Sequence, residues 1–357
     1  EYTTSDMDFT RATTATKINA PGDIVNSLTG YPRRDYGDWN NKQSCPHILV
    51  EPERTNLLTY SENFSDSSWT KQTGTVITAN QAVAPDGNTT AYKVVSDGSN
   101  GIFRTSVAID GVVARSVYLR SITGTLDVKL KDPNTTVSTV TCSLTTTWKR
   151  FELIEDNGNA GNLQGIWVDD IPADGIYMWG AQLELGSYAT SYIPTSGSTV
   201  TRNAETFTRT GINSLIGTAG VLYLEIQPIA IISGTQLSIA LSDGTLDNRV
   251  MFYYSTAGAI IGEVKVGGGT ANTVSDSSHT ETDFNKIAII YQDDKIEMVI
   301  NGGSATTTTG TWTIPSTLNQ ITFTAGNGSN NPFLGNIRNL QVYKTALTVG
   351  QCQSLTS

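Results

Sequence analysis

The fold class is decided by the stretch KIAIIYQDDKIEMVI at residues 286–300. It contains two runs rich in β-branched residues, 286–291 and 296–300, on either side of the polar residues 292–295. Two such runs around a short polar turn predict an antiparallel hairpin with a type I turn. The following Asn301-Gly302-Gly303 ends the second run.

The same character extends outward along the chain. Asp127–Lys131, Arg150–Leu153 and Val221–Gln227 alternate apolar with polar or charged side chains, which is the period of a half-buried strand. Further short strands are predicted at 117–120, 166–168 and 176–179. Only the tail, Thr348–Leu355, predicts a short helix. The fold class is therefore all-β, and the even spacing of the strands predicts antiparallel sandwiches.

Length and composition predict more than one core. The chain has 357 residues, with 38% hydrophobic and 16% charged residues, which is too apolar for disorder and too long for one ordinary domain. We expect an irregular N-terminal arm at 1–56 that packs on something else, a jelly roll at 57–197, a linker at 198–218 and a second jelly roll at 219–357. Phe9-Thr10-Arg11 recurs as Phe207-Thr208-Arg209, which is too short to define a repeat.

Charge and cysteine usage exclude several classes of protein. The net charge of −10 without a basic run argues against nucleic acid as a partner. Cys45, Cys142 and Cys352 are far apart, with no spacing for a disulfide framework or a zinc site. No apolar stretch approaches the ~20 residues of a membrane span. Because the chain opens at Glu1 rather than Met, we expect that an upstream segment was removed or not included.

Several phrases resemble ones that recur in bacteriophage tail and virion proteins. They lie at 9–16, 51–64, 179–195 and 200–205, and EPERTNLLTYSENF at 51–64 is the most specific. The resemblance implies a tail-fibre, head-fibre or related protein on the virion surface. It also implies other virion proteins as partners, and a homo-oligomer such as a trimer.

Each predicted jelly roll resembles a family of its own. The middle one is similar to the carbohydrate-binding modules attached to xylanases, with Phe64 and Trp69 after the first strand. Gln182 stands where that family commonly has an Asp of a calcium site. The last one resembles laminin-G and concanavalin-like lectin sandwiches through the hairpin ending at 299–302 and the stretch 333–343. These resemblances imply binding to bacterial surface glycans.

The residues argue against catalysis. Concanavalin-like glucanases place three acids on one strand in an E-x-D-x-x-E pattern, so that two carboxylates flank the scissile bond. The nearest match starts at Glu225 but continues with Gln227 and Ala230. His47 and His279 stand in no metal-ligand spacing, and no G-x-S-x-G elbow is present. We therefore expect no enzyme activity.

Sugar binding requires exposed aromatic faces with polar groups around them. Tyr253 and Tyr254 are adjacent, so on a strand one faces the core and the other faces outward. Trp312, after a Thr-rich loop, and Trp39, among Asp and Asn residues, are the other candidates for carbohydrate binding. The remaining tryptophans fall in or beside apolar strands and are predicted to be core: Trp69, Trp148, Trp167 and Trp179.

One acidic turn is a candidate metal site. Asp243, Asp247 and Asn248 supply the oxygen ligands that calcium prefers. The same residue types are also common in simple hairpin turns, so both interpretations stay open. No other cofactor is expected.

The leading hypothesis is a non-catalytic phage surface protein that adheres to bacterial glycans. One alternative is a capsid decoration or cement protein that binds no sugar, with its N-terminal arm buried against another subunit. Another is the binding part of a polysaccharide depolymerase.

Overall fold

Residues 286–300 form the expected hairpin in the computed structural model, which describes residues 7–38, 41–133, 138–156, 163–230, 237–280 and 283–357. Strand β24 (Asn285–Gln292) pairs with β25 (Lys295–Ile300), and Gln292 lies opposite Lys295. The turn therefore has two residues rather than the expected four. It is tight because Asp294 adopts a φ of 60°, a left-handed conformation that Asp tolerates.

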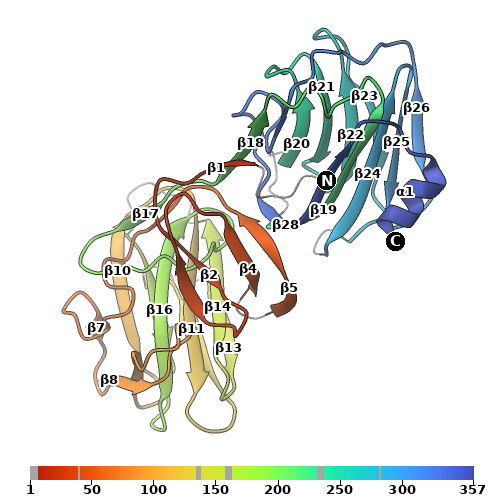
Figure 1. Cartoon of the computed structure of the whole chain (residues 1–357). Coiled ribbons are helices and arrows are strands. Elements are labelled where there is room, and N and C mark those ends of the chain that lie inside the picture. Colours follow the sequence, from red (N-terminus) through yellow and green to blue (C-terminus); the bar gives the residue numbers. More distant parts are fainter. Residues whose placement is uncertain (1–6, 39–40, 134–137, 157–162, 231–236, 281–282) are drawn as a thin grey trace.

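The hairpin belongs to a C-terminal sandwich of two seven-stranded antiparallel sheets (Figure 1). Sheet 1 contains, in spatial order, β1 (Asp8–Thr10), β18 (Thr206–Thr210), β27 (Gln320–Thr322), β20 (Leu237–Ser242), β21 (Arg249–Tyr254), β22 (Ile260–Lys265) and β23 (Asn272–Asp276). Sheet 2 contains β26 (Thr306–Thr309), β25, β24, β19 (Gly220–Pro228), β28 (Gly335–Tyr343), β5 (Asn41–Val50) and β4 (Arg33–Asp38). Alternate side chains such as Leu222, Ile239 and Phe252 fill the core between them.

A second sandwich of two five-stranded antiparallel sheets occupies the middle of the chain. Sheet 3 contains β13 (Thr139–Leu144), β12 (Leu126–Lys131), β15 (Leu163–Asp169), β10 (Ile102–Ala108) and β7 (Thr70–Lys71). Sheet 4 contains β14 (Lys149–Asp156), β11 (Val112–Ser121), β16 (Ile176–Leu185), β9 (Ala91–Val95) and β8 (Val76–Ala82). The strands predicted at 117–120, 127–131, 150–153, 166–168 and 176–179 are all confirmed.

The N-terminal arm is not irregular, which corrects the sequence-based expectation. Besides β1, β4 and β5 it contains the hairpin β2 (Ala15–Ile18) and β3 (Ile24–Ser27). Strand β1 pairs with β18, so that Phe9 lies opposite Phe207 and the two Phe-Thr-Arg phrases meet, while β5 pairs with β28. These strands are completed by partners far away in the chain, and local periodicity therefore does not reveal them.

The connector at 198–218 also differs from the expected linker. It contributes β17 (Val200–Arg202), which pairs with β6 (Arg54–Asn56), and β18 of sheet 1. The predicted C-terminal helix is confirmed as α1 (Val349–Thr356), with Thr348 as its N-cap, and it covers the outer face of sheet 2 (Figure 1). Among the described residues, no helix has the length and apolar character needed to cross a bilayer.

The N-terminal segment, residues 7–38 and 41–56, lies between the two sandwiches and contacts both. Figure 1 shows β4 and β5, in red and orange, at this junction. Ile24 of β3 packs against Tyr118 and Trp179, which project from the outer face of sheet 4. The segment therefore covers part of one face of the middle sandwich and extends sheet 2 of the other.

Candidate functional site

The outer face of sheet 3 carries a row of side chains that crosses all five strands. In β15, Ile166 and Val168 point into the core, so Trp167 between them points outward. The same alternation directs Phe103 of β10 outward, since Ile102 is in the core. The register aligns this row directly across the sheet as Thr139, Lys131, Trp167, Phe103 and Thr70.

Two aromatic rings form the centre of this row. The ring centroids of Phe103 and Trp167 are 5.9 Å apart, with planes tilted by 55°, and both side chains are half-buried. Lys131 Nζ lies 4.7 Å from the Trp167 ring and 2.5 Å from Asp169 Oδ2. Apolar ring surface beside an accessible charged group is a combination that holds a sugar: C–H groups contact the rings and hydroxyls meet the charge. The accessible charge here is the Lys131 ammonium, because Asp169 is only 3% exposed.

A cluster of aromatic side chains on the outer face of sheet 4 is covered. The Trp179 ring lies 4.7 Å from Tyr192 and 5.5 Å from Tyr118, and all three residues are buried. Tyr192 belongs to the loop that follows β16, and Ile24 closes the cluster from the N-terminal segment. Trp148 and Tyr177, which pack against this cluster, are half-buried, and Arg120 lies over both of their rings.

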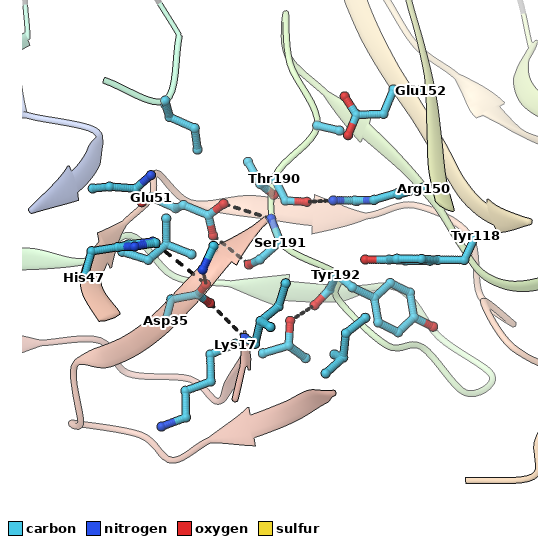
Figure 2. A pocket seen from close by; sticks show the side chains of 18 of the residues that line it. Lys17, Asp35, His47, Glu51, Tyr118, Arg150, Glu152, Thr190, Ser191 and Tyr192 are labelled. Atoms are coloured by element: carbon cyan, nitrogen blue, oxygen red, sulfur yellow. Dashed lines mark hydrogen bonds and ion pairs between the residues drawn. The ribbon is translucent and has the colours of Figure 1, made fainter. Parts of the chain in front are cut away.

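A cavity of about 600 Å³ lies where the N-terminal segment meets both sandwiches. Its lining comes from β2–β5, from β14 and the loop 189–192, from Tyr118 of β11 and Val140 of β13, and from the ends of β19 and β28. Figure 2 shows His47, Asp35 and Glu51 gathered on one side, with Tyr118 and Arg150 of sheet 4 on the other. Three separate parts of the chain must therefore come together to form it.

Asp35 and His47 are the unusual titratable pair of this cavity. His47 Nε2 lies 3.9 Å from Asp35 Oδ1, and both residues are almost fully buried. Burial raises the pKa of Asp35 to about 6, although backbone N–H groups of Ile18 and Gly37 donate to its carboxylate. Burial lowers the pKa of His47 to about 4, helped by nearby arginines, so its imidazole is neutral at pH 7.

Beside the cavity, a buried ion network joins the N-terminal segment to the connector. Glu51 Oε2 lies 2.7 Å from Arg33 Nη1 and 2.9 Å from Arg202 Nη1, and Ser191 N donates to Glu51 Oε1 at 2.8 Å. Burial alone would raise the pKa of Glu51, but these partners outweigh it and lower the pKa to about 2. Glu205 in turn accepts from Arg33 and from Arg11.

The aromatic residues predicted to bind sugar are not exposed. Tyr254 and Trp312 belong to the core of the C-terminal sandwich, with exposures of 1% and 7%. Tyr253 does project from the opposite face of β21, as expected, but it is 8% exposed because Ala325 and neighbouring residues pack over it. Trp39 lies outside the described residues.

The predicted calcium turn satisfies its own polar groups. Asp243 Oδ1 accepts from Thr245 N at 3.1 Å, and Asp243 Oδ2 accepts from Asn248 Nδ2 at 2.7 Å. Asn248 Oδ1 accepts from Gly267 N, and Asp247 is exposed. Within the part of the chain that the structure describes, no three His, Cys, Asp or Glu side chains gather as a metal-ion site.

Trp167 was predicted to be core but faces outward and is half-buried, which sequence reasoning missed. The signal was present, because a residue between two inward-facing β-branched neighbours must face outward. Trp148, also predicted to be core, is likewise half-buried, whereas the core assignments of Trp69 and Trp179 are confirmed. Asp35 and His47 carried no such signal, since only the fold brings them together.

Comparison with known proteins gives one family match. Residues 226–353 match the family described as the Concanavalin A-like lectin/glucanases superfamily, in agreement with the C-terminal sandwich. No curated protein sequence matches the chain.

Solved structures give only distant likenesses. The chain is similar to a "Ruminococcus gnavus IT-sialidase CBM40 bound to alpha2,3 sialyllactose", at 16% identity over 40% of this chain and 85% of that one, with a TM-score of 0.35. A pentraxin from Limulus polyphemus is 14% identical over 40% of this chain and 70% of that one, with a TM-score of 0.32. The CBM22-1 xylan-binding domain of Paenibacillus barcinonensis Xyn10C is 15% identical over 38% of this chain and 94% of that one, with a TM-score of 0.27. At these TM-scores none of the three bears on what this chain binds.

Proposed function

We propose that this chain is a non-catalytic glycan-binding protein of a bacteriophage surface, and that the open face of sheet 3 holds the sugar. The observation that carries the proposal is the half-buried pair Phe103 and Trp167 on neighbouring strands, flanked by the ion pair of Lys131 and Asp169. The row runs across the strands, so several sugar units of a polysaccharide could bind along it.

The location on a virion rests on the phrases at 9–16, 51–64, 179–195 and 200–205 that resemble phage virion proteins. A bacterial surface polysaccharide is then the glycan, and other virion proteins are the partners. An open platform binds one chain weakly, so we infer a homo-oligomer, such as a trimer, that gains affinity through effective concentration.

The absence of catalysis is part of the proposal. Glu225 is the first position of the glucanase pattern, and Arg338 Nη1 lies 3.6 Å from its carboxylate. The second position is Gln227, whose side-chain oxygen accepts from Asn336 Nδ2. An amide cannot serve as the nucleophile or proton donor that paired carboxylates provide.

The alternative of a capsid decoration protein has less support than the sequence suggested. It relied on an irregular N-terminal arm that would be buried against another subunit. In this chain the arm completes sheets 1 and 2 and covers sheet 4.

The proposal is tested by binding the whole chain to immobilised bacterial lipopolysaccharide and capsular polysaccharide, with purified phage capsids alongside. We expect retention on at least one polysaccharide and no shortening of that polymer on incubation. Shortened polymer would overturn the non-catalytic assignment. Retention on capsids alone would replace glycan binding with decoration.

A further inference from the structure

The cavity at the junction has polar atoms that the described residues leave unpaired. His47 is 3% exposed, and its Nδ1 has no hydrogen-bond partner there. Asn336 also lines the cavity, and its buried Oδ1 is likewise without a partner. A buried polar atom without a hydrogen bond costs about 1–3 kcal/mol, so such atoms in a cavity indicate an occupant that bonds to them.

The charges around the cavity favour an occupant that donates hydrogen bonds and carries no net charge. The guanidinium groups around the cavity are already engaged: Arg33 by Glu51 and Glu205, Arg338 by Glu225, and Arg150 by the carbonyl of Thr190 and other partners. The Lys17 ammonium points away from the other labelled side chains in Figure 2, and Lys149, which also lines the cavity, is exposed. An anion therefore finds no free guanidinium fork among these three arginines.

The walls of the cavity also contain apolar side chains. Ile18, Ile24 and Leu49 line the cavity from the N-terminal segment, and Pro228 and Ile229 line it from the end of sheet 2. The volume of about 600 Å³ falls within the range of about 300–1,000 Å³ typical of small-molecule sites. Apolar walls with a few hydrogen-bonding groups match the C–H faces and hydroxyls of a sugar.

We propose that this cavity is a second saccharide site, which takes a short neutral sugar whose hydroxyl groups bond to His47, Asp35 and Asn336. Asp35 can contribute because a carboxylate has about four acceptor positions, and the structure uses two of them for the N–H groups of Ile18 and Gly37. The site is separate from the aromatic pair of sheet 3, since its lining includes Val140 of β13 but neither Phe103 nor Trp167. It requires the N-terminal segment and both sandwiches together.

The two histidines allow a direct test on the whole chain. Histidine labelled with ¹⁵N gives ring signals from His47 and His279 only. His279 Nε2 lies 3.0 Å from the carbonyl of Gly258 in the C-terminal sandwich, so it serves as an internal reference. The probes are glucose, galactose and N-acetylglucosamine, with N-acetylneuraminic acid as the anionic comparison.

We expect at least one neutral sugar to shift the His47 ring signals saturably while those of His279 stay in place. The shift should persist in Trp167→Ala and need at least tenfold more sugar in Asn336→Ala. If no neutral sugar moves His47, the cavity holds only water and the inference is wrong. If the His47 shift disappears in Trp167→Ala, the sugar binds at sheet 3 and the second site is refuted. If the chain binds no polysaccharide but a neutral sugar still shifts the His47 signals, only the proposal for sheet 3 is refuted.

Discussion

Arg11 Nη1 lies 2.6 Å from Glu205 Oε1, and both side chains are fully buried although the residues are 194 positions apart. Arg33 Nε donates to the same oxygen at 2.8 Å. Arg11 and Glu205 belong to the phrases at 9–16 and 200–205, so these phrases join the N-terminal segment to the connector. Their charges act in the fold, and no ligand is needed to account for them.

Replacing Glu205 should therefore destabilise the whole chain. Glu205→Gln leaves the buried Arg11 guanidinium without a carboxylate and leaves Arg33 with Glu51 alone. Removal of one partner of a buried ion pair costs about 3–5 kcal/mol. Asp8→Asn is the control, because Asp8 is 66% exposed in its pair with Arg209 and such surface pairs contribute about 1 kcal/mol or less. Urea denaturation of both variants measures this, and equal midpoints would contradict the buried-network account.

The sequence predicts those elements of the fold that are determined by residues close together in the chain. The hairpin at 286–300 followed from its two β-branched runs around a polar turn, and helix α1 was expected in the tail. Strands β1 and β5 did not, because their partners β18 and β28 lie more than 150 residues away and supply the pairing. Their own sequence contains too few apolar positions to define a face.

The candidate site divides in the same way. Alternation around Trp167 contains the information that it faces outward, although an apolar run first favoured a core position. Trp312 is the opposite case: its backbone N–H donates to Asp294 Oδ1 and its indole N–H to the carbonyl of Gln292. The tight turn of the β24–β25 hairpin thus draws the ring into the core, and no local pattern signals this long-range contact.

Trp167→Ala should remove most glycan binding without unfolding the protein. Loss of one ring face from the platform should weaken binding about tenfold or more, which corresponds to about 1.4 kcal/mol. Trp148→Ala is the matched control, since Trp148 is also half-buried but packs beneath Arg120 and donates its indole N–H to the carbonyl of Val83. Calorimetric titration with the polysaccharide that retains the wild type compares the two, and equal losses would exclude sheet 3 as the site.

Asp35 and His47 should contribute opposite pH dependences to stability. With a pKa of about 6 instead of 3.8, folded Asp35 binds a proton between about pH 4 and 6 that the unfolded state releases, so its contribution to the free energy of unfolding falls as pH rises. With a pKa of about 4 instead of 6.5, His47 does the reverse over nearly the same interval. Each shift corresponds to about 3 kcal/mol, so the two largely cancel.

Single variants should separate the contributions of Asp35 and His47 to the pH dependence of the free energy of unfolding. In His47→Gln only the Asp35 contribution remains, so this variant should lose about 3 kcal/mol relative to wild type as pH rises from about 4 to 6. Asp35→Asn should gain a similar amount over the same interval. The other charged groups near the pair, Arg33, Glu51 and Arg338, are present in all three proteins. Urea denaturation at a series of pH values measures the slopes, and parallel slopes for both variants would refute the coupling.

Gly180 should be difficult to replace on the covered face of sheet 4. It has a φ of 62°, and a Cβ built there would lie 3.0 Å from Tyr118 Cδ2 and 3.4 Å from Tyr192. Gly124 has a φ of 60° with no atom within 4 Å of its Cβ position. Gly124→Ala therefore costs only the left-handed backbone, about 1–2 kcal/mol.

Gly180→Ala should add a further ~1–3 kcal/mol for overpacking against the two tyrosine rings. It should also change the fluorescence of Trp179, whose ring lies 4.7 Å from Tyr192, whereas Gly124→Ala should leave it unchanged. Denaturation midpoints and emission spectra of the two variants test both points. Equal destabilisation would mean that the N-terminal segment and the 189–192 loop shift to accommodate the added methyl group at little cost in free energy. The tight packing over sheet 4 would then be refuted.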